Sequence, residues 1–313
     1  MLEFTSYSIQ NIDDLKDLFT ICYTIIDDIY KEIAPSQIIN RKNILQSKLS
    51  DSEIITISLV GEITTIDSEN AWFNFVKRNY KDLFPNIGDR SRFNRTKRNL
   101  YTLIKEIQNK FVEISQIANS PVRIVDSMPI PVCKFGRAYF SKCFKDIATY
   151  GYCASKKETY FGVKLHALVT TEGFITNFLV TSSNVDDRDA LFELSSSLKN
   201  IQLIGDKGYI DKDIALAIAK EQSNLLFALK RKNSKTPYPK YFRNLLSKTR
   251  RRIETSFSQL ASQFNINNTL AKTKLGLMTR ITLKILAHNI CYFINLLHGN
   301  SNSIAQIKHL IFG

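Results

Sequence analysis

The spacing of apolar residues changes near Ser120-Pro121, and this change constrains the fold more than any other feature of the sequence. Before it, apolar residues recur every three or four positions, as on one face of a helix. The clearest case is the stretch 15–33. After it, short runs rich in Val, Ile, Leu and Phe alternate with helical patterns. A helical region is therefore predicted to precede a domain in which strands alternate with helices, which is an α/β fold.

Three further helices are predicted in the N-terminal part. Ser50 followed by Glu53 is the signature of a capping box at the start of the second helix. The third helix is predicted to stop near Pro85, and a long fourth helix covers 100–111. We therefore expect an all-helical N-terminal domain over residues 1–118.

A cluster of basic residues precedes the fourth helix and is predicted to form its beginning. Its members are Arg90, Arg92, Arg95, Lys97 and Arg98. Short helices followed by a helix with a basic start resemble helix-turn-helix organisation, in which one helix enters a DNA groove. This pattern makes Arg92, Arg95 and Arg98 candidate DNA contacts. The alternative is a plain helical bundle, because basic helix starts also occur there.

The remainder, residues 119–313, is predicted to be an α/β domain that ends in basic helices. Strands are predicted over 122–126, 130–133, 161–170, 174–180, 200–206 and 224–229. Helices are predicted over 186–198, 211–220, 251–264 and 275–297. The third and fourth strands flank a glycine-containing turn and are expected to form a hairpin.

The charge of the chain is concentrated in its last third. The whole chain has 43 Lys and Arg against 29 Asp and Glu, which gives a formal net charge of +14. From Gln222 onward there are fifteen basic residues and one acid, so this segment alone has a net charge of +14. This distribution indicates a polyanionic partner, and nucleic acid is the one expected. The alternative is a solvated basic surface without a specific partner.

The cysteines and the hydropathy pattern exclude several classes. Cys133, Cys143 and Cys153 are spaced by ten, but they form no CxxC pair, so free thiols in a reducing cytoplasm are expected rather than a zinc site. No apolar run reaches the roughly 18 residues of a membrane span. The acidic residues near the start argue against a secretory signal. A cytoplasmic, nucleoid-associated protein is therefore expected.

Two aspartates stand at the ends of apolar strands. Asp126 follows Arg-Ile-Val, and Asp206 follows Leu-Ile-Gly and precedes Lys-Gly-Tyr. A carboxylate beside a buried strand is costly to desolvate unless another group compensates its charge. Mg²⁺ is one such group, because it prefers oxygen ligands. The alternative for each aspartate alone is the capping of the following turn.

Glu254 strengthens the argument for a metal site. It is the one acid in the basic C-terminal segment and follows Arg250-Arg251-Arg252 directly. A carboxylate along a DNA-binding surface repels phosphate unless a cation neutralises it. Asp126, Asp206 and Glu254 could together hold two cations about 3.5–4 Å apart, the arrangement used for phosphodiester cleavage. The alternative is a salt bridge between Glu254 and Arg250 across one helical turn.

Other polar residues have simpler interpretations. Asp186, Asp187 and Asp189 form a rival acidic cluster, but a position at a helix start favours capping. His166 lies within an apolar strand and is expected to be a satisfied core or surface histidine. Lys164, two residues earlier on the same strand face, is a candidate phosphate contact.

At these residues the sequence resembles the DDE transposases of bacterial insertion sequences. The resemblance covers most of the chain, through the segments 49–56, 91–95, 125–133, 151–156, 160–166, 204–209 and 250–257. Asp-Lys-Gly-Tyr after an apolar strand, followed later by Arg-x-x-x-Glu, is the most specific pair. Two positions depart from related transposases: Ser247 stands where a Tyr is common and Ala261 where a Lys is common, and Lys248 and Gln259 are the nearest substitutes.

The resemblance implies a fold, an activity and a set of partners. The fold is an RNase H-like mixed sheet with flanking helices, preceded by an all-helical domain. The activity is metal-dependent DNA cleavage and strand transfer at element ends. The implied catalytic and metal-binding residues are Asp126, Asp206 and Glu254, with two Mg²⁺ ions per site that Mn²⁺ is expected to replace. The implied partners are double-stranded terminal repeats, target DNA and a second or further copy of the chain.

Basic residues on several segments are expected to contact DNA, mostly its backbone. They are Arg92, Arg95, Arg98, Lys156, Lys164, Lys207, Lys230, Arg231, Lys232, Arg250 and Arg251. Two alternatives to a transposase stay open from the sequence. One is a metal-dependent nuclease of the same fold that cuts without strand transfer, and the other is an inactive DNA-binding descendant.

Overall fold

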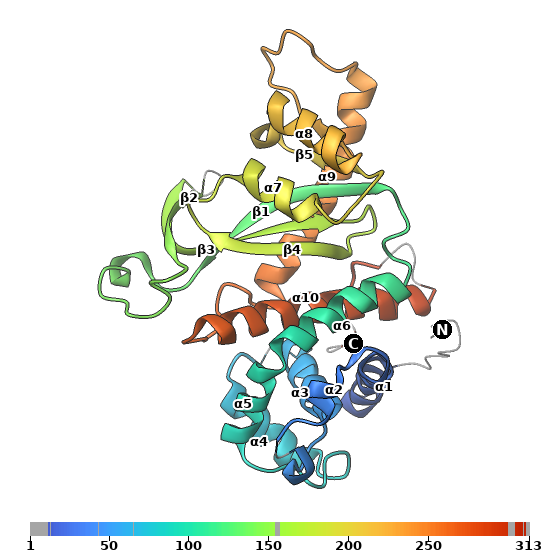
Figure 1. Cartoon of the computed structure of the whole chain (residues 1–313), viewed down its shortest axis with the longest axis vertical. Helices are drawn as coiled ribbons and strands as arrows, with labels where there is room; N and C mark the ends of the chain where they lie inside the picture. The colour runs from blue at the N-terminus through green and yellow to red at the C-terminus, as the bar shows by residue number, and fades with distance from the viewer. Residues whose placement is uncertain are drawn as a thin grey trace. The chain divides into compact units, whose positions relative to one another are not determined.

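The computed structural model describes residues 12, 14–42, 44–64, 66–153, 157–299, 304–308 and 310 (Figure 1). The chain divides into two compact units. The helical unit comprises Met1–Ser115 and Ser262–Gly313, and the sheet unit comprises Gln116–Ala261. The sheet unit begins near the predicted boundary at residue 118, but it ends at Ala261, whereas the sequence prediction extended it to residue 313.

The helical unit contains the predicted helices together with shorter ones. Its elements are α1 (Leu15–Ile33), α2 (Ser36–Ile39), η2 (Ile44–Gln46), α3 (Asp51–Ile63), α4 (Glu69–Asn79), α5 (Arg90–Asn99), α6 (Tyr101–Ile114) and α10 (Lys274–Leu297). The predicted capping box of α3 is confirmed: Ser50 Oγ accepts the N–H of Glu53, and the Glu53 carboxylate accepts the N–H of Ser50. Both contacts involve backbone donors at the helix start that have no partner within the helix.

Helix α10 explains why the C-terminal residues belong to the helical unit. It is buried along most of its length and packs against α3 and α6. Helix α3 is also almost entirely buried and contacts both α1 and α10. A helix that is apolar on most sides needs partners on most sides. Apolarity predicted correctly that α10 is buried, but it carries no information about which elements bury it.

The basic cluster forms a helix of its own, which corrects the prediction that it begins the long fourth helix. Helix α5 starts at Arg90 with Asp89 as its N-cap, and α6 starts at Tyr101. Leu100 lies between them, leaves helical geometry (φ −83°, ψ 6°) and buries its side chain. The chain therefore turns at this residue, and the basic residues lie on a separate helix in front of α6.

A buried ion-pair cluster joins α3 and α10. The Glu62 carboxylate lies 2.6 Å from Lys284 Nζ and 2.9 Å from Arg280 Nε. The Glu62 and Lys284 side chains are only 4% and 2% exposed. Burial opposes ionisation of Glu62, but the two cations outweigh it and lower the pKa of the carboxyl below its usual value. Two of the basic residues of the C-terminal third therefore neutralise a buried acid of the helical unit.

The sheet unit is built on a six-stranded sheet. Its elements are β1 (Val122–Pro131), η3 (Phe135–Arg137), β2 (Thr149–Cys153), β3 (Glu158–Val169), β4 (Ile175–Ser182), α7 (Asp187–Ser195), β5 (Gln202–Gly205), η4 (Lys207–Tyr209), α8 (Lys212–Gln222), β6 (Leu225–Ala228) and α9 (Lys240–Ser262). The strand order is β2-β3-β1-β5-β6, and β4 also pairs with β3. Because β1 is antiparallel to β3 and parallel to β5, the sheet is mixed, and the predicted fold class is confirmed.

Strand β1 is continuous, whereas the sequence predicted two strands separated by Pro129. It pairs with β3 from Ile124 to Pro131, but with β5 only from Val122 to Ile124. The stretch that contains Pro129 therefore has no strand paired on its β5 side. Proline lacks a backbone N–H, and this is tolerated where no neighbouring strand needs the hydrogen bond. Helix α9 also differs from the prediction, since it begins at Lys240 rather than at residue 251. Its first part is mostly exposed, although Tyr241-Phe242 and Leu245-Leu246 lie one helical turn apart and are a signal that the prediction overlooked.

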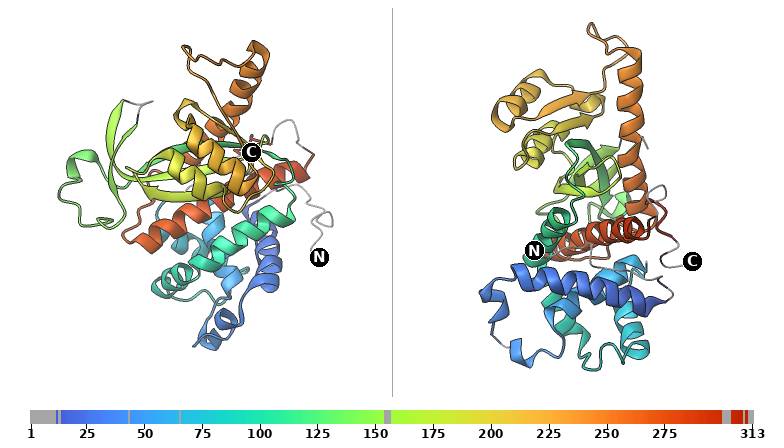
Figure 2. Two further views of the ribbon diagram at one scale, coloured as in Figure 1. Left: turned by 45° about the horizontal axis from the view of Figure 1, so that its top comes forward. Right: turned by 90° about the vertical axis from the view of Figure 1, so that its right-hand side faces the viewer.

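Helices α7 and α8 cover one face of the sheet, and α9 lies on the other (Figure 2, right). On the first face, Val125 and Leu168 pack with Leu191 of α7 and Ile218 of α8. Successive side chains of a strand point to opposite faces. Asp126, which follows Val125, therefore points to the face on which α9 lies.

The five cysteines are free, and Cys143 is exposed whereas Cys153 is buried. In the part of the chain that the structure describes, no helix combines the length and the apolarity that a membrane span requires.

Candidate active site

Asp126 is positioned by the centre of the sheet. It lies on β1 opposite Ala167 of β3 and is partly buried, with a side chain 20% exposed. Its Oδ1 accepts the N–H of Ser127 at 2.9 Å, and its Oδ2 accepts from Arg250 Nη2 at 2.8 Å. Arg250 and Asp126 are 124 residues apart in the sequence. The strand fixes the carboxylate, and helix α9 brings a cation to it.

Asp206 follows β5, beside β1 in the sheet, and the Asp-Lys-Gly-Tyr motif explains its orientation. Its Oδ1 accepts the N–H of Gly208 at 2.6 Å and so caps the short helix η4. A Cβ at position 208 would lie 2.9 Å from that oxygen, so only glycine fits there without a shift. Tyr209 anchors the turn, because its ring is buried in the core beneath α7 and α8. The predicted capping role is thus present.

Glu254 lies on α9, one turn after Arg250. Arg250 Nη1 donates to Glu254 Oε1 at 2.9 Å, so the salt bridge that the sequence offered as the simpler alternative exists. The same guanidinium also binds Asp126. The salt bridge is therefore compatible with a place for Glu254 in the site, because Arg250 links Glu254 to Asp126 on β1.

The three carboxylates share one electrostatic environment around Arg250. Burial by itself lowers the pKa of Arg250, but the charges of Asp126, Asp206 and Glu254 outweigh it and raise the pKa above its ordinary value. Burial raises the pKa of Asp126, and the charge of Asp206 adds to that rise, whereas Arg250 and the Ser127 N–H oppose it. Ionised Asp126 therefore needs a cation, and Arg250 supplies the positive charge in this conformation.

The donor chemistry of this cluster fits a divalent cation, although the arrangement is not that of a closed metal site. Carboxylate oxygens are the ligands that Mg²⁺ prefers, and one or two carboxylates commonly suffice. Among the described residues, however, no three His, Cys, Asp or Glu side chains lie close enough together to hold a metal. Arg250 lies between Asp126 and Glu254 and keeps them bound to its own guanidinium.

Lys164 and His166 lie on the other face of the sheet from Asp126. The β1–β3 register puts Ser127 opposite His166 and Asp126 opposite Ala167, so their side chains alternate between faces. Lys164 Nζ donates to Asp187 Oδ1 at 3.0 Å. His166 is buried and bonded to Thr181, and burial foremost lowers its pKa to about 4. A core histidine is confirmed, and Lys164 is engaged by an acid of α7.

The rival acidic cluster has the capping role that the sequence favoured. Asp186 is the N-cap of α7 and accepts the N–H of Arg188 at 2.9 Å. The side chain of Arg188 also donates to it and lowers its pKa to about 2. Asp187 and Asp189 lie in the first turn of the same helix, where a negative charge is favourable.

The basic segment after β6 presents most of its cations to solvent. Of its ten Lys and Arg residues up to Arg252, eight are exposed, among them Arg231, Lys232 and Arg251. Lys230 is partly covered and lies over the ring of Tyr238 at 5.3 Å. Lys207, beside Asp206, is exposed, and so is Lys248, whereas Gln259 is buried. Lys156 lies outside the described residues.

We expect the exposed Lys and Arg residues after β6 to make DNA binding weaker at higher salt concentration. Replacing Lys230, Arg231 and Lys232 with Ala should reduce the slope of log affinity against log salt by up to about three, because each lost phosphate contact removes roughly one unit. Binding to a duplex would be measured by fluorescence anisotropy at several salt concentrations. The matched control replaces three exposed lysines beside the α7–α8 face: Lys199, Lys212 and Lys220. Equal slopes in the two triple variants would exclude this segment as the DNA surface.

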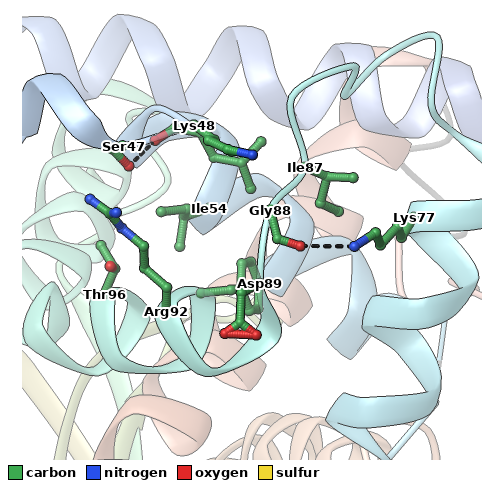
Figure 3. A pocket seen from close by; sticks show the side chains of 11 residues that line it. Ser47, Lys48, Ile54, Lys77, Ile87, Gly88, Asp89, Arg92 and Thr96 are labelled. Carbon is green, nitrogen blue, oxygen red and sulfur yellow. Dashed lines mark hydrogen bonds between the residues drawn. The ribbon is translucent and has the colours of Figure 1, made fainter.

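Helix α5 divides its basic residues between a buried and an exposed role. Lys97 is buried and paired with Glu69, whereas Arg92 and Arg95 are exposed, and Arg98 is partly covered. Arg92 lines a pocket of about 470 Å³ in the helical unit. Figure 3 shows Arg92, Lys48 and Lys77 around the apolar side chains of Ile54 and Ile87. Asp89 lines the same pocket, so its charged residues are of both signs.

If α5 recognises a particular DNA end, replacing Arg92 and Arg95 with Ala should reduce the preference for element-end over random duplex. Both arginines are exposed, so the variant should fold like the wild type. Competition binding with the two duplexes measures the preference, and an Arg78→Ala/Lys81→Ala variant in the same unit serves as a control. An equal loss of affinity for both duplexes would show that the arginines contact only the backbone.

One surface of the sheet unit was missed by the sequence reasoning. The segment between β1 and β2 exposes several aromatic rings, including Tyr139 and Phe140, which are 81% and 78% exposed. The available signal was the interleaving of Phe and Tyr with Lys and Arg over residues 134–145.

Comparison with known proteins finds one matching family. The family model described as the transposase DDE domain matches residues 116–274, just over half of the chain. The match includes β1, the turn after β5, and α9, which carry Asp126, Asp206 and Glu254 respectively. No curated protein and no solved structure matches the chain.

Proposed function

The chain belongs to the transposase DDE domain family, and on that premise we propose that it cuts DNA at the ends of an insertion sequence and joins the freed ends to target DNA. The substrates are double-stranded terminal repeats and a target duplex. Asp126, Asp206 and Glu254 are the proposed catalytic residues. The contact of one guanidinium with both Asp126 and Glu254 is the observation that carries the proposal.

The three carboxylates are the proposed ligands of two divalent cations, Mg²⁺ or Mn²⁺. When bound, such ions polarise the phosphodiester and activate the attacking oxygen for in-line displacement. The chain's own contribution is to hold the ligands in place. Asp126 is held by β1 and the Ser127 N–H, and Asp206 by the Gly208 N–H. Glu254 becomes available as a ligand once Arg250 releases it.

Arg250 has two roles in this proposal. In the structure it compensates the charges of Asp126 and Glu254, of which Asp126 is the more buried. When the Arg250 side chain turns away from the carboxylates, its positive charge is available to a phosphate oxygen of the bound DNA. A guanidinium is well suited to bind phosphate. Both proposed reactions, hydrolysis that exposes a 3′-OH and attack by that 3′-OH on target DNA, are displacements at phosphorus. One site therefore serves both by exchanging the nucleophile.

The exposed cations between β6 and the middle of α9 would hold the DNA backbone, and α5 of the helical unit would contact an element end. We further propose that two or more copies act together on paired ends in the bacterial nucleoid. Neither Ser247 nor Ala261 supplies the side chain that related transposases use at those positions. Lys248 is exposed on the same helix and is the proposed substitute, whereas Gln259 is buried and excluded from this role.

Incubation of the purified protein with a labelled element-end duplex and Mg²⁺ tests the proposal. A transposase gives both nicked and joined products. Nicks without joined products would indicate a nuclease of the same fold, and binding without either product would indicate an inactive DNA-binding descendant. The last two results would each overturn the proposed strand transfer.

A further inference from the structure

The segment from the end of β1 through β2 carries an aromatic surface that contains none of the proposed catalytic residues. We call residues 132–153 the arm; it projects from the sheet beside β2 and β3 in Figure 1. Among the described residues, eight aromatic side chains are exposed, and five of them belong to the arm. They are Phe135, Tyr139, Phe140, Tyr150 and Tyr152.

The arm also has buried side chains, which are distinct from the exposed rings. Ala138, Phe144 and Ala148 are buried. The Phe144 carbonyl accepts the N–H groups of Ile147 and Ala148, which closes the turn before β2. Ser182 Oγ of β4 donates to the Ile147 carbonyl at 2.9 Å and ties the arm to the sheet. The five rings therefore remain available to a partner.

Four of the five rings form two contacting pairs. Phe135 and Tyr150 make an edge contact with ring centroids 5.7 Å apart, and Tyr139 and Phe140 make another at 5.2 Å. Tyr150 also contacts Phe161 of β3 at 5.1 Å. Each pair leaves ring surface open to solvent. Such exposed rings offer faces on which other flat groups can stack.

The charge of the arm indicates which kind of partner it binds. Lys134, Arg137, Lys142 and Lys145 are exposed, and Asp146 is the one acid of the arm. Aromatic rings interleaved with cations are the pattern by which proteins bind single-stranded nucleic acid: the bases stack on the rings and the cations contact the phosphates. A second copy of this chain is a poorer occupant, because two arms of net positive charge repel each other.

The sheet register puts part of this surface on the same face as the catalytic carboxylate. Tyr150 lies opposite Phe161, and Asp126 lies opposite Ala167. Phe161 and Ala167 are six positions apart on β3, so their side chains share a face and are separated by roughly 20 Å. A strand held at Asp126 would therefore reach Tyr150 after about six nucleotides at the spacing of a DNA strand.

We propose that the arm binds unpaired nucleotides of the DNA strand whose phosphate is held at Asp126. The exposed rings stack on the bases, and the four cations contact the phosphates between them. Paired bases hide their faces inside the duplex, so this surface favours single-stranded over double-stranded DNA. The inference rests on the proposed function, which identifies the bound strand. The arm adds a DNA-binding surface to that function.

Binding to a labelled 20-nucleotide oligothymidine and to a 20-base-pair duplex, measured by anisotropy without divalent metal, tests the arm. A Tyr139→Ala/Phe140→Ala variant should lose at least tenfold in affinity for the single strand, since stacking is lost at two rings. Its affinity for the duplex should change by less than threefold. The Tyr139→Phe/Phe140→Tyr variant keeps both rings and should bind the single strand within twofold of the wild type.

Thermal unfolding and light scattering complete the test. Both variants should unfold like the wild type, because Tyr139 and Phe140 are largely exposed. Unchanged single-strand binding, or an equal loss on both DNAs, would overturn the proposal. Loss of a dimer with unchanged DNA affinity would also overturn it and show that the rings join copies of the chain. A wild type that binds single strands through the arm but neither cuts nor joins would refute only the proposed function.

Discussion

Replacing Glu254 with Gln should reduce Mg²⁺- or Mn²⁺-dependent cleavage to background while fold and DNA binding persist. The amide keeps the volume of the side chain and removes a charged ligand. The lost salt bridge with Arg250 is partly exposed and on a helix surface, so its contribution to stability is only about 0.3–0.5 kcal/mol. Gel analysis of a labelled element-end duplex measures cleavage, and anisotropy measures binding.

Asp126→Asn and Asp206→Asn should have the same effect on cleavage, because all three carboxylates are proposed ligands of one site. DNA binding without metal should persist or strengthen, since a negative charge near the phosphates is removed. Glu221→Gln on α8 is the matched control, as an exposed acid outside the site, and should cleave like the wild type. A Glu254→Gln protein that still cuts DNA would remove the third ligand and leave the arginine salt bridge as the whole role of Glu254.

Replacing Glu62 with Gln should lower the free energy of unfolding by about 3–5 kcal/mol, because it leaves Lys284 buried without a compensating charge. Arg280 loses the same partner. Urea unfolding followed by circular dichroism measures the change. Asp82→Asn breaks the exposed pair between Lys16 and Asp82 and should change stability little. Equal effects of the two substitutions would show that the buried cluster adds no more than a surface pair.

The pH dependence of stability should reveal the same cluster. Because the folded protein holds the pKa of Glu62 below its ordinary value of 4.5, the stabilisation is fully present above that pH. It should be lost as the pH falls below 4.5 and through the lower folded-state pKa. The Glu62→Gln variant should lack this part of the acid sensitivity.

Local features of the fold were predictable from the sequence, because their causes are local. The capping box at Ser50 and Glu53, the hairpin of β3 and β4, and the capping role of Asp186 depend on residues only a few positions apart. The continuity of β1 through Pro129 was not predictable in this way. β1 tolerates Pro129 because β5 pairs with only its first residues, and this is a property of the neighbouring strand.

The candidate site shows the same division. Asp126 and Asp206 could be selected because a carboxylate that directly follows an apolar run has a solvation cost that the sequence displays. The sequence suggested that Arg250 pairs with Glu254, and it does. It contained no sign that the same guanidinium also binds Asp126, or that Lys164 points to the opposite face of the sheet.

The sequence by itself determined the types of element, the concentration of charge in the last third and the three acids available for chemistry, because these follow from residue order and composition. Only the tertiary structure decided which elements are neighbours. It placed α10 with the N-terminal helices, directed Arg280 and Lys284 to Glu62 instead of to DNA, and brought α9 to β1. The physical reason is that burial and charge pairing depend on surfaces that meet across long stretches of chain, and an apolar or charged pattern does not specify its partner.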